Sequence, residues 1–243
     1  MTAPLLEIAA NSLASAMAAQ EGGADRIELC ENLGEGGTTP SHGTLSMARD
    51  KLRIPIYALI RPRGGDFLYD EAELEAMRCD IEHCVRLGCD GVVIGALDAD
   101  GDIDVAACRV LINAAGKLGT TFHRAFDAAR DRAQALQDII ALGCERVLTS
   151  GAANDALRGA EEIAAAVRDG AGRIRVMAGA GVTAENIGEI VRLSGAHEFH
   201  ASARSLRRSA MRHRQAGLSG LEPERMQTDP EIVRALAEKL RNL

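Results

Sequence analysis

Aromatic residues are scarce in this chain: they make up 2% of its 243 residues, and tryptophan is absent. A surface that stacks nucleic-acid bases, or a large aromatic protein-binding face, needs such rings, so both are disfavoured. Positive charge is also in deficit, because 28 lysines and arginines stand against 35 acidic residues and give a formal net charge of −7. Dedicated nucleic-acid binders are usually basic overall, so we expect no nucleic-acid partner.

Long apolar runs and secretory signals are missing as well. No apolar run approaches the roughly 18 residues that a membrane helix needs, so we expect no membrane association. Glu7 interrupts the apolar start and no basic segment precedes it, which argues against a signal peptide. The six cysteines form no Cys-x-x-Cys pair. We therefore expect buried, reduced thiols and a cytoplasmic location.

The chain has ample apolar residues, at 47%, arranged in a repeating pattern of short β-like runs and amphipathic helical stretches. The expected strands are residues 5–10, 26–30, 54–61, 91–96, 120–126, 146–150, 173–178 and 198–201. Helices are expected over 12–20, 41–51, 71–87, 105–118, 132–142, 155–169 and 184–193. Together they make a series of βα units, the pattern of parallel strands joined by crossover helices.

Eight such units within about 200 residues predict an α/β fold, a single (β/α)8 TIM-like barrel. An open doubly wound sheet is the alternative, but it calls for a glycine-rich turn after the first strand, where Ala9, Ala10 and Asn11 stand instead. We assign residues 1–203 to the barrel. Residues 204–243 are expected to form a C-terminal helical extension: a connector, then a helix that begins at Asp229 and packs on the barrel. The connector's arginines are 204, 207, 208, 212 and 214.

Charged residues interrupt several of these strands. Buried parallel strands are normally apolar, and an unpaired buried charge is costly, so each interruption needs a reason. The active sites of (β/α)8 barrels lie at the carboxyl ends of the strands, where such residues would converge. The alternative is an ion-pair network that fills the barrel. The interrupting residues are Glu7, Glu28, Arg61, His123, Arg124, Glu198 and His200.

Among them, Glu7, Glu28 and His123 are the candidate catalytic residues. Alternation along the fifth strand places His123 and Ala125 on one face, and we expect His123 to point into the barrel. A histidine beside a glutamate in a cleft makes a usable acid/base pair. A buried core histidine is the other interpretation.

Arginines and loop glycines indicate an anion-binding site. Arg61 and Arg63 flank a proline after the third strand, and guanidinium groups bind carboxylate or phosphate in a fork; alternatively, they pair with Asp66 and Glu28. Phosphate sites in barrels often use the loops after strands seven and eight, although glycines there also serve tight turns. The candidate anion-binding residues are Arg61, Arg63, Ser150, Gly179, Gly181, Ser202 and Arg204.

No His-Glu-x-x-His or zinc-type Cys/His spacing is present. Cys30 lies at the carboxyl end of the second strand and is the one thiol that qualifies as a soft-metal ligand. The other interpretation is that Cys30 only packs in the core.

Six segments resemble the CutC-type copper homeostasis family, within a match over residues 5–205. They are residues 22–30 (GGADRIELC), 35–41 (EGGTTPS), 60–69 (IRPRGGDFLY), 121–127 (TFHRAFD), 146–151 (RVLTSG) and 198–204 (EFHASAR). The resemblance implies a cytoplasmic TIM-like barrel, a homodimer or larger homo-oligomer, and a role in copper tolerance or Cu(I) binding. It also implies a pair of copper-binding cysteines. Cys30 matches the second, and Ala9 stands at the first, with Met177 and His200 as candidate replacements.

Two functions remain open from the sequence. One is a Cu(I)-binding protein that uses Cys30, and its partner is copper. The other is an enzyme whose strand-end residues act on a small anionic substrate, a phosphate or a carboxylate. A third hypothesis, partner binding through the arginines of residues 204–214, is weaker, because such a segment more simply forms a solvated or subunit-contacting face.

Overall fold

A computed structural model of the chain describes residues 4–213, 215, 217 and 224–243. Eight parallel strands close into a barrel in sequence order, with β8 pairing β1. The predicted (β/α)8 barrel is thereby confirmed. The strands are β1 Leu5–Ala10, β2 Arg26–Leu29, β3 Ile56–Leu59, β4 Gly91–Ile94, β5 Gly119–Phe122, β6 Arg146–Thr149, β7 Arg175–Gly179 and β8 Glu198–Ala201.

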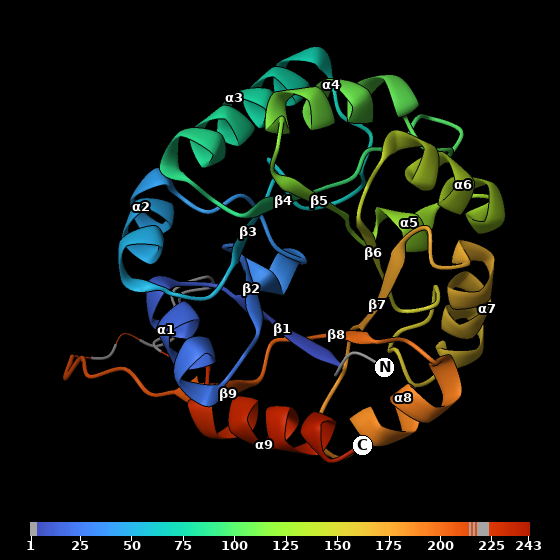
Figure 1. The fold of residues 1–243 in the computed structure, drawn as a ribbon. Coiled ribbons are helices and arrows are strands. Elements are labelled where there is room, and N and C mark those ends of the chain that lie inside the picture. The colour runs from blue at the N-terminus through green and yellow to red at the C-terminus, as the bar shows by residue number, and fades with distance from the viewer. Residues whose placement is uncertain (1–3, 214, 216, 218–223) are drawn as a thin grey trace.

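Helices form a ring around the strands, as Figure 1 shows in a view down the barrel. They are α1 Leu13–Gly22, α2 His42–Lys51, α3 Glu71–Leu87, α4 Val105–Ala115, α5 Ala125–Ala128, α6 Arg132–Leu142, α7 Ala160–Gly170, α8 Ile187–Ser194 and α9 Pro230–Arg241, with a short 3₁₀ turn at Leu33–Glu35. Within the described residues, no helix is long and apolar enough to cross a membrane.

The C-terminal helix completes this ring. α9 begins after Asp229, whose carboxylate accepts from the N–H of Glu231 at 3.1 Å, and it packs between α8 and α1 (Figure 1). The sequence analysis placed this helix outside the eight units, whereas the structure uses it as the eighth outer helix. The connector before it contains an antiparallel pair, β9 Arg204–Arg207 and β10 Arg225–Thr228, which the sequence pattern did not predict. Arg214 lies outside the described residues.

Of the predicted elements near the site, two differ most from the structure. The strand predicted over 120–126 ends at Phe122, because the N–H of Ala125 donates to Nδ1 of His123 at 3.1 Å and the chain turns into α5. His123 and Arg124 therefore follow the strand. The helix predicted from residue 155 begins only at Ala160, after a turn in which Gly159 packs against the backbone of Ser150.

Side chains on each strand point alternately to the outside of the barrel, where the helices pack, and to the inside of the barrel. On β1, Leu6, Ile8 and Ala10 belong to the apolar core between barrel and helices. Glu7 lies on the opposite face, inside the barrel, where it meets charged side chains of other strands. The barrel axis is therefore polar, and its charges must be satisfied by one another.

Candidate functional site

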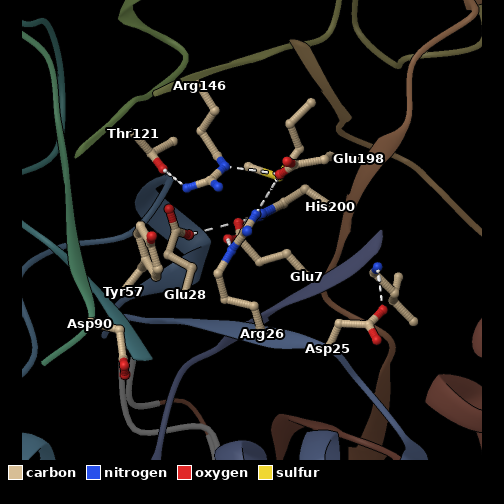
Figure 2. A network of polar contacts seen from close by, with 12 residues as sticks. Glu7, Asp25, Arg26, Glu28, Tyr57, Asp90, Thr121, Arg146, Glu198 and His200 are labelled. Atoms are coloured by element: carbon tan, nitrogen blue, oxygen red, sulfur yellow. Dashed lines mark hydrogen bonds and ion pairs between the residues drawn. The ribbon is translucent and has the colours of Figure 1, made fainter. Parts of the chain in front are cut away.

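The barrel interior holds a buried ion-pair cluster, drawn in Figure 2. Arg26 donates from Nε to Oε2 of Glu7 at 2.5 Å and from its terminal nitrogen to Oε2 of Glu198 at 2.8 Å. Arg146 donates from Nε to the same oxygen of Glu198 at 2.9 Å. The ring of Tyr57 lies 5.0 Å from both guanidinium carbons. The ion-pair alternative is thus correct for this part of the barrel.

These contacts hold the acids of the cluster ionised. Burial would raise the pKa of Glu7, but Arg26 and His200 outweigh it and lower that pKa to about 2. Burial likewise opposes ionisation of Glu198, and Arg146 and Arg26 lower its pKa below the ordinary value. Glu7 is therefore held as a carboxylate near neutral pH, and its two oxygens are engaged by Arg26 and His200.

His200 connects this cluster to a second carboxyl group. Its Nδ1 lies 2.7 Å from Oε1 of Glu7, and its Nε2 lies 3.8 Å from Oε2 of Glu28 (Figure 2). Burial would lower the pKa of His200, but Glu28 and Glu7 raise it above the ordinary value. Burial, with a contribution from Glu7, raises the pKa of Glu28 to about 7. Glu28 and His200 therefore form a buried carboxyl–imidazole pair in which the pKa values of both groups lie above their ordinary values.

A pocket of about 950 Å³ opens above this pair at the carboxyl ends of the strands. Both Glu28 and His200 line this pocket, whereas Glu198 and the arginines that contact it do not. It is also lined by Met226 and by Ile232 of α9, so the C-terminal segment contributes to its wall. The predicted site residues that line this pocket are Glu28, Arg61, His123, Gly181, Ser202 and Arg204.

Arg61 brings an unneutralised charge to the pocket. Arg61 is 5% exposed, and its terminal nitrogens donate to the carbonyl oxygens of Glu35, Gly37 and Gly65 at 2.7–2.9 Å. These bonds tie together the loops after β2 and β3. No carboxylate of the described residues lies within ion-pair distance of this guanidinium, so the predicted alternative of pairing with Glu28 does not apply. A buried cation without an acidic partner favours an anion as its ligand.

His123 lies in the pocket but not beside a glutamate. Its ring is 5.0 Å from the ring of Phe67, and burial together with Arg61 lowers its pKa to about 3. The histidine that does contact glutamates is His200. From the sequence, His200 was recognised as a charged interruption of the eighth strand, but no catalytic role was predicted for it. Its contact with Glu7 depends on the closure of the barrel, which places β8 next to β1.

Two predicted anion-binding side chains are held by other contacts. Arg63 is paired with Asp66 at 3.1 Å, as the alternative expected, and also with Glu73 at 2.5 Å, a partner that the alternative did not name. Ser150 is fully buried, and its Oγ donates to the carbonyl oxygen of Ala153 and accepts from Arg124. Neither residue lines the pocket.

The two candidate glycines, Gly179 and Gly181, are required by the packing and by the backbone conformation. A Cβ on Gly179 would lie 2.5 Å from Leu148 and 3.2 Å from His200, so this glycine permits the close packing of His200. Gly181 has a φ of +67°, and a Cβ there would lie 2.9 Å from that of Asp155. The tight-turn interpretation therefore holds at Gly181, which also lines the pocket.

The thiol of Cys30 is poorly placed for copper. It is fully buried, does not line the pocket, and lies 3.7 Å from the carbonyl oxygen of Ala10. Burial raises its pKa well above the ordinary value, whereas a metal ligand must be a thiolate. Ala9 offers no donor, and Met177 Sδ already accepts from Arg26 at 3.5 Å. The described residues contain no group of three or more His, Cys, Asp or Glu side chains placed to hold a metal ion. This donor set does not fit a Cu(I) site.

A closed eight-stranded parallel barrel with a pocket at the carboxyl ends of its strands defines a TIM-barrel protein. The CutC family model matches residues 4–205, and the chain belongs to the CutC family. The CutC protein of Xylella fastidiosa strain 9a5c is 63% identical over 201 residues, 83% of this chain and 75% of that protein. The CutC protein of Chromobacterium violaceum is 56% identical over 241 residues, 97% of this chain and 98% of that protein.

A solved structure agrees with the same assignment. The crystal structure of CutC from Streptococcus agalactiae, a protein named for copper homeostasis, has 36% sequence identity to this chain and a TM-score of 0.79. The match covers 82% of this chain and 98% of the streptococcal chain. The family resemblance expected from the sequence is therefore confirmed.

Proposed function

We propose that this protein is an enzyme that moves a proton on a small anionic substrate bound in the pocket. The observation that carries the proposal is the buried guanidinium of Arg61, which has no acidic partner among the described residues and shares a pocket with Glu28 and His200. An unneutralised cation beside a carboxyl–imidazole pair is suited to binding an anion and exchanging protons with it.

The residues divide into three roles. Glu28 gives and takes the proton, with His200 as its exchange partner, because the pKa of Glu28 is near 7. Glu7 is a positioning residue that orients His200 through Nδ1. The anionic group of the substrate is bound by Arg61 or, at the far side, by Arg204, whose Nε donates to Ser202 at 3.2 Å.

The test is a substrate screen of the full chain against pools of small phosphorylated and carboxylated metabolites, followed by mass spectrometry. We expect wild type to consume at least one compound. Glu28→Gln should slow that reaction by about 10²–10⁴-fold, the usual contribution of a general acid or base. Arg63→Leu, outside the pocket, is the matched control and should retain the activity. Equal rates for wild type and Glu28→Gln, or no consumption by wild type, would contradict the proposal.

Copper binding is the second candidate, and it comes from the name of the streptococcal relative and from Cys30 at the end of β2. The donor set around Cys30 favours the enzyme instead, and a Cu(I) titration decides between them.

We also propose a cytoplasmic location, supported by six free cysteines. A homodimer is proposed too, supported by the exposed side chains of Leu206 and Met226 on the β9–β10 pair.

A further inference from the structure

Arg124 brings a second guanidinium to the pocket, and the sequence analysis named this residue only as an interruption of the fifth strand. It follows the end of β5, lines the pocket, and has a side chain that is 44% exposed. Its Nε donates to Oδ2 of Asp127 at 2.7 Å, and its Nη2 donates to Oγ of Ser150 at 2.8 Å. Both bonds use the side edge of the guanidinium. The end edge, formed by Nη1 and the second hydrogen of Nη2, has no acceptor among the described residues.

Asp127 fixes this orientation of Arg124. Its carboxylate is 8% exposed and also accepts from the hydroxyl of Thr149 at 2.5 Å and from the N–H groups of Ser150 and Ala152 at 3.0 and 3.1 Å. Burial opposes ionisation of Asp127, but the hydrogen bonds from Thr149, the loop N–H groups and Arg124 lower its pKa. Because Arg124 is held against this anchored loop, little rotamer freedom is lost when its end edge binds a ligand.

Arg204 lies on the other side of the pocket mouth. It follows β8 and lines the pocket, and its Nε donates to Oγ of Ser202 at 3.2 Å. Within the described ranges, its terminal nitrogens have neither a carboxylate partner nor another acceptor. The strands close in sequence order, so β8 lies opposite β4, and β5 is the neighbour of β4. Arg124 and Arg204 therefore approach the pocket from nearly opposite sides of the barrel.

Apolar side chains lie between the two arginines. β6 and β7 separate β5 from β8, and Leu148 on β6 and Val182 after β7 both line the pocket. A carbon skeleton packs favourably against such a wall, whereas a charged group does not. The pocket, at about 950 Å³, has room for a small molecule with a charged group at each end.

The charges around the pocket match such a molecule. Arg61 and Arg204 have no acidic partner in the part of the chain that the structure describes, whereas Asp127 balances the charge of Arg124. Arg61 follows β3 and Arg124 follows β5, so these two arginines flank β4 and face Arg204 across the mouth. Unneutralised cations on both sides of the pocket are balanced by a ligand that has a negative charge at each end.

We infer that the substrate carries two anionic groups, phosphate or carboxylate, joined by a short carbon chain. The end edge of Arg124 binds one group, close to the charge of Arg61, and the terminal nitrogens of Arg204 bind the other. Guanidinium groups bind such oxyanions through two parallel hydrogen bonds. Asp127 is a positioning residue for Arg124. The inference rests on the proposed function, because it names the substrate class of that pocket.

Calorimetric titration of the full chain with matched probes tests this inference. Glycerol 3-phosphate and 3-phosphoglycerate share a skeleton, but only the second has a carboxylate besides its phosphate. Fructose 6-phosphate and fructose 1,6-bisphosphate form a longer pair that differs by one phosphate. We expect wild type to bind the doubly anionic member of at least one pair about 10–100-fold more tightly than its partner, the effect of one charge-assisted contact.

Arg124→Met and Arg204→Met should each abolish this preference, because either substitution leaves only one bound anionic group. Arg124→Lys keeps the charge but cannot bond the loop and a ligand at once, so it should retain only part of the preference. Arg63→Met is the matched control: Arg63 lies outside the pocket and is paired with Glu73, so the preference should be that of wild type. Circular dichroism checks that each variant is folded.

The outcomes separate the inference from the proposed function. Equal affinity of wild type for both members of each pair, or no binding of any of the four probes, overturns the inference. A preference that survives Arg124→Met or Arg204→Met also overturns it, as does an equal loss in Arg63→Met. None of these titrations requires turnover or involves Glu28. The proposed function is decided separately, by the activity of Glu28→Gln in the substrate screen.

Discussion

His200 Nδ1 lies 2.7 Å from Oε1 of Glu7, and this contact joins the closed ion-pair cluster of the barrel to the open pocket above it. The other ring nitrogen of His200 faces Glu28 at 3.8 Å. Glu7 stays ionised because Arg26 and His200 both contact it, so it fixes the orientation of the imidazole. A side chain that is rigid on one side and reactive on the other is what an acid/base site requires.

Replacing Glu28 by glutamine should stabilise the protein at high pH. The pKa of Glu28 is about 7 in the folded protein, against an ordinary value of 4.5, so folding favours its protonated form. The protonated Glu28 side chain contributes its full share to the stability of the fold below pH 4.5, and this contribution is lost as the pH rises through 7. Glutamine cannot ionise, so Glu28→Gln should gain stability over wild type above pH 7, on the order of a few kcal/mol.

Urea unfolding between pH 4 and pH 9 measures this difference. The exposed Glu238 on α9 supplies the control Glu238→Gln, whose stability should follow wild type at every pH. A Glu28→Gln profile parallel to wild type would mean that Glu28 titrates normally.

Arg26 should be far more important for stability than Arg175, although both contact Glu198. Arg26 is 5% exposed and links Glu198 to Glu7, whereas Arg175 is 70% exposed and lies 3.3 Å from Glu198. Removing one partner of a buried ion pair costs about 3–5 kcal/mol, and removing an exposed partner about 0–1 kcal/mol. We expect Arg26→Met and Arg175→Met to show these two costs in urea unfolding. Similar losses for both variants would show that the cluster is not an effective buried network.

Arg61 should control anion binding in the pocket, and Arg63 should not. Inorganic phosphate and glycerol phosphate serve as probes in calorimetric titrations. Arg61→Met removes a charge-assisted hydrogen bond and should weaken binding about 10–100-fold. Arg61→Lys, which keeps the charge, should retain part of the affinity.

Arg63→Met removes an arginine of the same loop that is already paired with Glu73 and Asp66, so affinity should not change. Circular dichroism checks that the loops held by Arg61 still permit folding. Equal weakening in the Arg61 and Arg63 variants would indicate only a general loss of positive charge.

Cu(I) affinity should not depend on Cys30. The thiol is buried, its pKa is raised well above normal, and no second sulfur ligand stands at position 9. Anaerobic titration of the reduced protein against a competing chelator should give the same weak binding for wild type and Cys30→Ala. Tight stoichiometric binding that disappears in Cys30→Ala would instead establish the copper function.

The sequence predicted the fold because local patterns and chain length are enough to specify repeated βα units. The helix over 71–87 was predicted with its observed ends, since Asp70 and Glu73 form a capping box and Gly88 terminates the helix with a φ of +73°. The strand over 120–126 was predicted too long, because the turn at His123 depends on a side-chain hydrogen bond to Ala125 that no periodicity reveals.

The site was only partly predictable, for a related reason. Charged residues inside buried strands mark a polar barrel interior, and Glu28, Arg61 and His123 were identified in this way. Which charges neutralise one another depends on the register of neighbouring strands. Pairing of β1 with β8 puts Glu7 opposite His200, residues separated by 193 positions in the chain.

By itself, then, the amino-acid sequence determined the (β/α)8 architecture, the apolar outer core and the family, because these depend on periodic burial and on motifs that are local in the chain. Only the tertiary structure decided that Glu7 pairs with Arg26, that His200 lies between Glu7 and Glu28, and that Arg61 has no acidic partner among the described residues. Electrostatic energies depend on separations of a few ångströms between side chains from distant strands, and those separations exist only in the folded barrel.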